Sequence, residues 1–310
     1  MRKLLAVAAL VFSSANIADA DQLTPVRFGL QKIGAVTSVW AAIQTGIFNK
    51  HGIDVKMIEI PSTEQSIALL QAKTIDIILQ IPGNGMIAKE AGFDIVLIGQ
   101  NETAGTTPPA TNAIMVPMNS PVQSLADLRG KRVSMSSTHG QGPSAFKELL
   151  QRNGIASNQV PVTSVPYTAS ADLLRSGQID AAVTLDPYST QIRKSGIGRT
   201  ISWYLIETIP DQPVGSWWAL RSWAQAHPKE AVAFDAAIRE THEYLHADPQ
   251  RARKAVSDYT GLDPALVRDM PMISWKADMD MVVWQKVADM LQRQGELARH
   301  HDVSEYLLKR

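Results

Sequence analysis

The chain of 310 residues contains no cysteine. This absence excludes disulfide bridges, thiolate metal sites and a thiol nucleophile, together with the functions that depend on them. It also excludes a lipid-modified cysteine as a membrane tether. An excess of charge of one sign is lacking as well, because 30 basic residues balance 30 acidic ones. The balance gives the chain no electrostatic preference for nucleic acid or for an anionic membrane.

Long apolar runs are scarce, and the most informative one lies near the N-terminus. Two basic residues precede an apolar run from Leu4 to Phe12, and Ala18-Asp19-Ala20 follows as a small-x-small signal. This order is typical of a secretory signal peptide, whereas a buried N-terminal helix is the simpler alternative. The run is too short to span a bilayer, which takes about 20 residues. We therefore expect residues 1–20 to be removed on export, leaving a soluble protein outside the cytoplasm.

Two segments of the remaining chain repeat each other. LLQAKTIDIILQ (residues 69–80) and LLRSGQIDAAVT (residues 173–184) both contain Leu-Leu, four spacer residues, Ile-Asp and then apolar residues. Gly52-Ile53 and Gly154-Ile155 form a second matched pair, since each follows a predicted helix and precedes a predicted strand. Convergent local βα patterns could produce one such match. The common order and spacing favour two similar α/β lobes.

Strand and helix patterns alternate through both halves of the chain. The predicted strands cover residues 26–30, 55–60, 75–80, 95–99, 113–116, 132–136, 160–165 and 181–185. From Pro228 the pattern becomes helical, with helices predicted over residues 228–247, 249–259, 264–270 and 279–294. We therefore predict a two-lobed α/β fold, each lobe a mixed sheet flanked by helices, joined by a two-strand hinge near residues 105–113 and 207–217. The predicted boundaries are 21–110 for the first part of lobe 1, 111–212 for lobe 2 and 213–310 for the return to lobe 1.

Four loops are the candidates for a ligand site. In open α/β sheets, ligands bind beyond the carboxyl ends of the strands. Applied to both halves, this rule selects residues 29–38 with residues 134–144, and residues 80–85 with residues 184–189. If the lobes face each other, all four loops border one cleft. Two equivalent lobes would then form a hinged clamp around a small solute.

The loop SSTHGQGPS (residues 136–144) is the most informative of the four. Its hydroxyl groups and glycines stand at a predicted helix start, where free N–H groups and the helix dipole attract anions. A capped turn with small residues is the alternative interpretation. Lys32 and His139 could add positive charge, although an exposed lysine in a loop is usually only solvated.

The loop LDPY (residues 185–188) could contact the other end of a solute through Asp186 and Tyr188. Trp217 and Trp218 follow the second predicted crossing, and alternation along a strand suggests that only one of them faces the cleft. Tyr and Trp offer broad apolar surface with a polar group. In the alternative interpretation, one Trp belongs to the core and Asp186 caps the helix that follows Pro187.

These segments resemble a known family. The resemblance is carried by AAIQTGIFNKHGIDVKMIEI, ALLQAKTIDIIL, SLADLRGKRVSMSS, LLRSGQIDAAVTLDPY and the helical segment from HPKEA to HADPQRARKAV. The sequence is similar to the periplasmic solute-binding proteins of ABC importers, in the group for sulfonate, taurine, nitrate and thiamine-pyrimidine precursors. The resemblance implies a type II binding-protein fold and delivery of the solute to a membrane permease driven by an ATPase.

The resemblance also implies which positions line the cleft. They are Gln31, Thr37, Ser38, Pro82, Gly83, Asn84, Ser137, Thr138, Asp186 and Trp217. Our interpretation of the loops adds His139, Gly140 and Tyr188. A few relatives are enzymes, namely desulfinases and a thiamine-pyrimidine synthase, but they rely on cysteine. We therefore expect no enzymatic activity of either kind.

One motif argues for an enzyme instead. His242-Glu243-Tyr244-Leu245-His246 matches H-E-x-x-H, in which two histidines bind zinc and the glutamate activates water. A catalytic zinc needs a third protein ligand. The extended motif would place a histidine where Ala252 stands, and only Asp258 could substitute. We therefore expect a solvated surface turn here and keep a zinc-dependent hydrolase as the alternative function.

Taken together, these patterns predict a monomeric periplasmic binding protein, not lipidated, that takes up a small organic anion and needs no metal or cofactor. Its expected partners are the permease and the ATPase of the importer, without nucleic acid and without insertion into the membrane. Sulfonate, taurine, nitrate, carboxylate and pyrimidine ligands are not separated by the sequence. Asp186 would suit an amine, and a Trp in the cleft would suit an aromatic ring.

Overall fold

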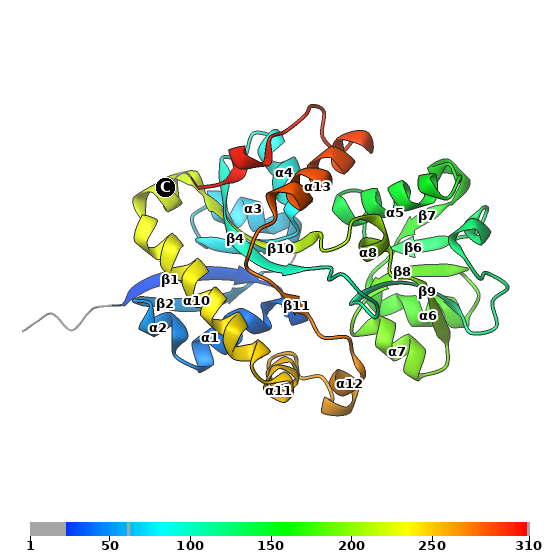
Figure 1. The fold of residues 1–310 in the computed structure, drawn as a ribbon, viewed down its shortest axis with the longest axis horizontal. Coiled ribbons are helices and arrows are strands. Elements are labelled where there is room, and N and C mark those ends of the chain that lie inside the picture. The colour runs from blue at the N-terminus through cyan, green and yellow to red at the C-terminus, as the bar shows by residue number, and fades with distance from the viewer. Residues whose placement is uncertain (1–22, 61–62, 309–310) are drawn as a thin grey trace, which may run out of the picture.

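The computed structural model describes residues 23–60 and 63–308, and these residues form two lobes side by side (Figure 1). The predicted signal peptide, residues 1–20, lies outside the described residues. Among the described residues, no helix combines the length and the apolar character needed to cross a bilayer.

Lobe 1 is built on a six-stranded mixed sheet with the order β11-β4-β10-β3-β1-β2. Its strands are β1 (Thr24–Leu30), β2 (Ile53–Glu59), β3 (Ile77–Gln80), β4 (Ile95–Thr103), β10 (Pro213–Leu220) and β11 (Ser274–Trp275). Strand β1 runs parallel to β2 and β3, whereas β10 runs antiparallel between β3 and β4. Alternate apolar residues of β1, Val26 and Phe28, are fully buried, as expected for a strand with one face on a core.

Helices cover both faces of this sheet. They are α1 (Thr37–Gln44), α2 (Ile47–Lys50), α3 (Thr63–Gln71), α4 (Pro82–Glu90), α9 (Arg221–Ala226), α10 (Pro228–His246), α11 (Pro249–Thr260), α12 (Pro264–Asp269) and α13 (Met281–Arg293). Helices α1, α2 and α10 pack on one face, and α3, α4 and α13 pack on the other. The four predicted C-terminal helices are present near their predicted boundaries. Proline in the first turn of α10, α11 and α12 explains why these starts could be predicted.

Lobe 2 contains a five-stranded mixed sheet with the order β7-β6-β8-β5-β9. Its strands are β5 (Asn112–Pro117), β6 (Val133–Met135), β7 (Val162–Ser164), β8 (Ala181–Leu185) and β9 (Gly198–Ser202). Its helices are α5 (Gln141–Arg152), α6 (Ser170–Arg175), α7 (Tyr188–Lys194) and α8 (Tyr204–Thr208). The described residues of the two lobes also contain the short 3-10 helices η1 (Gly34–Val36), η2 (Leu125–Leu128), η3 (Ser157–Gln159), η4 (Tyr167–Ala169) and η5 (Val303–Tyr306). The predicted two-lobed α/β fold is confirmed, and β9 is a strand that the prediction omitted.

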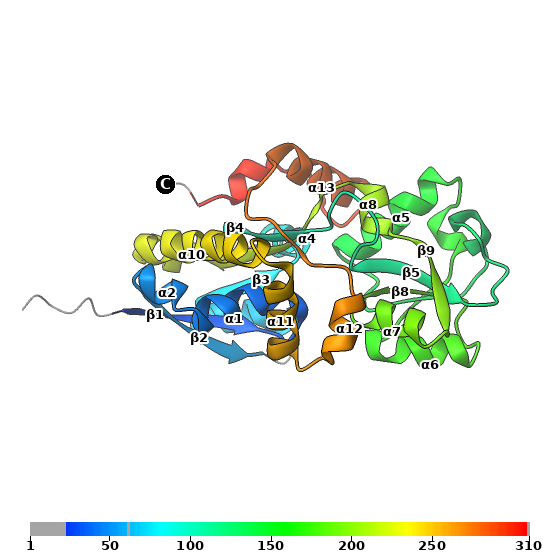
Figure 2. The same cartoon turned by 60° about the horizontal axis from the view of Figure 1, so that its bottom comes forward.

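Two segments connect the lobes. Residues 104–111 lead from β4 into β5, and residues 209–212 lead from α8 back into β10 (Figure 2). The two segments are hydrogen-bonded to each other: Ala104 N donates to Gln212 O over 2.8 Å, and Asp211 N donates to Gly105 O over 2.8 Å. Both crossings lie within or next to the predicted segments.

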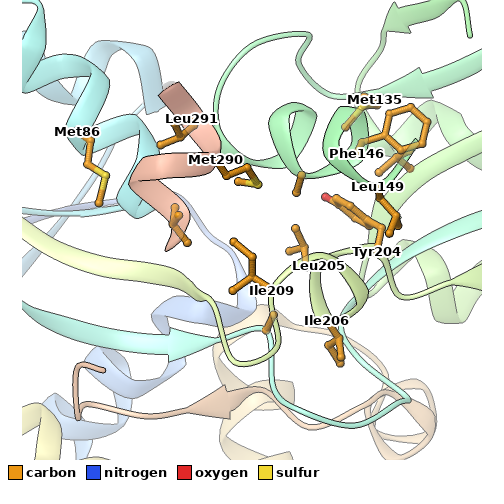
Figure 3. Packing of buried hydrophobic residues seen from close by; sticks show 14 of the residues in the cluster. Met86, Met135, Phe146, Leu149, Tyr204, Leu205, Ile206, Ile209, Met290 and Leu291 are labelled. Atoms are coloured by element: carbon orange, nitrogen blue, oxygen red, sulfur yellow. The ribbon is translucent and has the colours of Figure 1, made fainter. Parts of the chain in front are cut away.

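One apolar cluster continues from lobe 1 into lobe 2. Figure 3 shows its side chains gathered between α4 and α13 of lobe 1 and α5 and α8 of lobe 2. Met86, Met290 and Leu291 belong to the first lobe, and Phe146 and Leu205 to the second. Truncating one such buried residue to alanine typically costs about 2–5 kcal/mol. The cluster therefore holds the lobes together on one side of the molecule.

Candidate functional site

Each of the four predicted loops leads from a strand into a helix. Strand β1 leads into η1 and α1, β3 into α4, β6 into α5, and β8 into α7. Because β1 is parallel to β3 and β6 is parallel to β8, the carboxyl ends of each pair lie at the same edge of their sheet. The structure therefore places the two loops of each lobe at one edge of that lobe's sheet.

The start of α4 is in direct contact with the other lobe. Gly83 N donates to Gln141 Oε1 over 2.9 Å, and Gln141 Nε2 donates to Gln212 Oε1 over 3.0 Å and to Pro213 O over 2.8 Å. A Cβ atom on Gly83 would lie 2.9 Å from Gln141 Cβ, so only glycine permits this approach. Gly83 and the buried Pro82 thus form part of an interlobe contact, and Gln141 is the key partner that the prediction did not single out.

Asn84 and Gly140 face each other across the lobes. Gly140 has φ +98°, and a Cβ atom on it would lie 2.6 Å from Asn84 Oδ1. Asn84 Oδ1 is itself buried and has no hydrogen-bond partner within the described part of the chain. The two predicted site residues therefore meet where the lobes approach each other.

The first loop of lobe 1 is tied to the end of β4. Ser38 Oγ donates to Asn101 Oδ1 over 2.9 Å, and Asn101 Nδ2 donates to Ala35 O over 2.9 Å. Thr37 Oγ1 is buried without a partner in the described residues, while Gln31 is half-buried beyond β1. The hydroxyl of Ser38 is thus already engaged, whereas that of Thr37 is available.

The loop before α5 presents Ser137, Thr138 and His139. Ser137 Oγ donates to His139 O over 2.9 Å, and His139 Nδ1 lies 3.5 Å from Glu296 Oε1 of lobe 1. Thr138 and His139 also line a cavity of about 360 Å³ along α5, with Phe146 among its apolar lining residues. These loop side chains are therefore exposed or half-buried, and they border open space.

Asp186 both caps α7 and keeps one oxygen unused. Its Oδ1 accepts hydrogen bonds from Ser189 Oγ over 2.8 Å and from Thr190 N over 3.0 Å, as the alternative interpretation proposed. Its Oδ2 is buried without a partner in the described residues, and so is the hydroxyl of Thr184. Burial raises the pKa of Asp186, although these hydrogen bonds and the charge of Arg193 act against the shift.

Tyr188 has an aromatic neighbour that the prediction missed. Its ring stacks on Tyr167, with centroids 6.1 Å apart and planes at 26°. Tyr167 begins η4, after β7. The strand-end rule applied to the predicted strand 160–165 could have found this residue.

The structure corrects the prediction for Trp217. As predicted, Trp217 and Trp218 point to opposite faces of the sheet, but both are 0% exposed. Trp217 packs edge-on against Phe28 at 5.6 Å and against Phe234 at 5.4 Å, and Trp218 packs against Tyr306 at 6.0 Å. Neither lines a cleft, because helices cover both faces of the lobe 1 sheet.

The H-E-x-x-H motif also differs from its prediction, because His242 is buried rather than solvated. Its Nε2 lies 3.1 Å from Asn101 Oδ1, and since this carbonyl oxygen can only accept, the nitrogen carries the proton. Burial lowers the pKa of His242 to about 3, so the ring is neutral. Within residues 23–60 and 63–308, no group of three or more His, Cys, Asp or Glu side chains could hold a metal ion. The motif instead supports Asn101, which holds the first loop.

Glu102 is a further residue that the sequence prediction missed. It follows Asn101 at the end of β4 and pairs with Gly215 of β10. Burial raises the pKa of its carboxyl group to about 7. Within the part of the chain that the structure describes, Glu102 makes no side-chain hydrogen bond or ion pair. The sequence feature that could have identified Glu102 is the polar triplet from Asn101 to Thr103, which follows an apolar strand.

Comparison with known proteins places this chain in a family. A family model described as NMT1/THI5 like matches residues 34–252. The chain is 23% identical over 286 residues to a Haemophilus influenzae protein named for thiamine biosynthesis, with 88% of this chain and 87% of the relative covered. It is 25% identical over 319 positions to a Bacillus subtilis protein named for binding aliphatic sulfonates, with 97% and 93% covered.

A solved structure shares the fold. The alkanesulfonate-binding protein SsuA from Xanthomonas axonopodis pv. citri, bound to MOPS, superposes with a TM-score of 0.74 at 20% identity. The match covers 93% of this chain and 99% of that protein. The predicted relationship to periplasmic binding proteins is thereby confirmed. Because the family model spans more than half of its length, the chain belongs to the NMT1/THI5-like family.

Proposed function

We propose that the protein is the solute-binding component of an ABC uptake system. It captures a small organic anion between its lobes and delivers it to the permease, acting as a monomer without enzymatic activity or cofactor. Residues 1–20 direct it to the periplasm, where it remains unlipidated. The fold and the sulfonate-binding relatives support this role.

Buried polar atoms without partners carry the proposal. Thr37 Oγ1 and Asn84 Oδ1 in lobe 1, and Thr184 Oγ1 and Asp186 Oδ2 in lobe 2, are buried without a hydrogen bond in the described residues. Most buried polar groups in folded proteins have a partner, and an unsatisfied one costs about 1–3 kcal/mol. All four residues lie in or next to the loops at the strand ends. A solute held between the lobes would supply the missing partners.

The start of α5 supports an anionic end on this solute. No side chain caps this 12-residue helix at Gly140. Its first N–H groups and the positive end of its dipole therefore favour an anion. The hydroxyl group of Thr138 stands beside it and can donate a hydrogen bond, and that of Ser137 can do so by releasing His139 O.

The connections between the lobes support closure around the solute. Lobe 2 is proposed to cover residues 111–212, with residues 21–110 and 213–310 forming lobe 1. The two hydrogen-bonded crossing segments then form the hinge, and Gln141 links α4 to the second segment. A rotation about this side would open and close the opposite side of the cleft.

Titration of the purified protein tests the proposal. We expect one compound class among alkanesulfonates, taurine, nitrate, carboxylates and pyrimidines to bind at one site and to raise the melting temperature. The double variant Ser137→Ala/Thr138→Ala should weaken this binding. Ser176→Ala, which removes an exposed hydroxyl elsewhere in lobe 2, is the matched control. The proposal fails if no class binds, or if binding survives the double substitution unchanged.

A further inference from the structure

An ion pair joins the two lobes on the side away from α13. Lys194 Nζ, in the last turn of α7 in lobe 2, pairs with Asp269 Oδ2 at the end of α12 in lobe 1. The helices α7 and α12 also contact each other. Figures 1 and 2 both show α12 next to α7, at the opposite end of the interlobe region from α13. The ion pair therefore lies apart from the apolar cluster that holds the lobes together.

Helix α12 is firmly attached to lobe 1. Asp263 Oδ1 accepts a hydrogen bond from Ala265 N over 2.7 Å and so caps the start of the helix. Toward the other end, Arg253 of α11 donates to the carbonyl oxygens of Val267 and Met270. The side chains of these two residues are buried in the apolar cluster around α11. The carboxylate at the end of α12 therefore moves with lobe 1 as one body.

The elements that carry the ion pair also carry two of the candidate ligand loops. Ile273 follows α12, and its Cδ1 lies 3.3 Å from the place that a Cβ atom on Gly34 would occupy, at the start of η1. In lobe 2, Lys194 lies on the helix that starts at Tyr188 and is capped by Asp186. The ion pair therefore connects a segment packed on the first loop of lobe 1 with the helix that follows a loop of lobe 2.

The strength of this pair suits a contact that forms and breaks. The hydrogen bond from Lys194 lowers the pKa of Asp269, and the charge of Arg268 acts in the same direction, so the carboxyl group is ionised at neutral pH. The side chains of Lys194 and Asp269 are 44% and 38% exposed, so water and salt weaken their attraction. An exposed pair typically changes an equilibrium constant by up to about fivefold. Such a factor shifts the balance between two lobe arrangements without fixing either one.

We propose that the Lys194–Asp269 pair is a latch that restrains α7 and α12 from separating. This inference concerns the regulation of the proposed ligand site and rests on the proposed function, because separation of the lobes gives a solute access to that site. The apolar cluster keeps the lobes joined at α5 and α13. Breaking the latch then permits a rotation about the crossing segments 104–111 and 209–212. Salt weakens the latch and leaves the apolar side intact.

Interlobe distances in the solute-free protein test the latch. Spin labels at Lys56→Cys and Arg175→Cys sit on β2 and α6, which lie on the same side of the molecule as α12 in Figures 1 and 2. Separation of α7 from α12 therefore lengthens the distance between the labels. Pulsed dipolar spectroscopy compares the labelled protein with its Lys194→Glu variant, in which two like charges meet. We expect this variant to raise the population at longer distances at least about twofold.

A charge exchange and a matched control accompany this variant. Lys194→Glu/Asp269→Lys restores opposite charges at the two positions and should restore the original distance distribution. Lys254→Glu reverses an exposed lysine that pairs with Asp258 inside α11, so it should leave the distribution unchanged. Sodium chloride at about 1 M, where charges are screened beyond about 3 Å, should move the labelled protein in the same direction as Lys194→Glu.

The outcomes separate the latch from the proposed function. The inference is overturned if Lys194→Glu leaves the distribution unchanged, or if the exchanged pair behaves like Lys194→Glu. Because the measurement needs no solute, a latch effect together with no binding in the titrations would refute the proposed function and support the latch. Binding of a titrated compound without any latch effect would overturn the latch alone.

Discussion

Glu102 makes the stability of the solute-free protein depend on pH. Burial raises the pKa of its carboxyl group from the ordinary value of 4.5 to about 7. Below pH 4.5 the group is protonated in both the folded and the unfolded chain, and its contribution to stability is fully present. As the pH rises from 4.5 through 7, the unfolded chain loses this proton first, so the free energy of unfolding falls.

The size of the effect follows from the shift. A shift from 4.5 to about 7, at about 1.4 kcal/mol per unit, corresponds to about 3 kcal/mol. The side chain keeps some exposure, and screening by solvent lowers this value, so we expect about 1–3 kcal/mol. Glu102→Gln cannot ionise. It should therefore be more stable than the wild type by this amount at pH 8 and should differ little at pH 4.5.

Urea unfolding followed by tryptophan fluorescence measures this difference. Wild type, Glu102→Gln and the control Glu243→Gln are compared without solute at pH 4.5 and at pH 8. The control should follow the wild type at both values, because Glu243 is exposed. The reasoning is refuted if Glu102→Gln and the wild type lose the same free energy of unfolding between pH 4.5 and pH 8.

Three further predictions concern the lobe contact and the histidine motif. Gln141→Ala removes the acceptor of Gly83 N and should lower the free energy of unfolding by about 1–3 kcal/mol in urea titrations; no loss would contradict the role of this bridge. Gly140→Ala should lower the melting temperature and weaken solute binding, because φ is +98° and the methyl group would press on Asn84; an unchanged melting temperature would count against the contact. Dialysis against a chelator should change neither the metal content of the protein nor its solute binding, since His242 is hydrogen-bonded to Asn101 inside the protein. Stoichiometric zinc in the purified protein would instead support the zinc-dependent hydrolase.

Local sequence patterns predict the fold and the loops because they report local structure. Alternation and short apolar runs mark strands, and Pro228, Pro249 and Pro264 mark helix starts. The repeated segments 69–80 and 173–184 each end in a strand, β3 and β8, that leads to a candidate loop. Equivalent loops could thus be identified without knowledge of the tertiary structure.

Contacts between distant segments explain what the sequence did not reveal. Alternation predicts that Trp217 and Trp218 point to opposite faces, but it does not predict that helices cover both faces. His242 is buried and hydrogen-bonded to Asn101, which is 141 residues away in the chain. Glu102 lies at the end of β4, and the loop after β4 does not belong to the matched pairs of loops. The comparison of the two halves therefore did not identify this residue.

An interlobe distance measurement tests the central claim that the lobes close on a solute. The absence of cysteine allows spin labels at Lys56→Cys in lobe 1 and Arg175→Cys in lobe 2, both exposed positions. Pulsed dipolar spectroscopy then compares the distance distribution without solute and with a saturating amount of the solute that binds in the titrations. We predict a narrower distribution with solute, centred at a different distance. An identical distribution in both samples would contradict the claim.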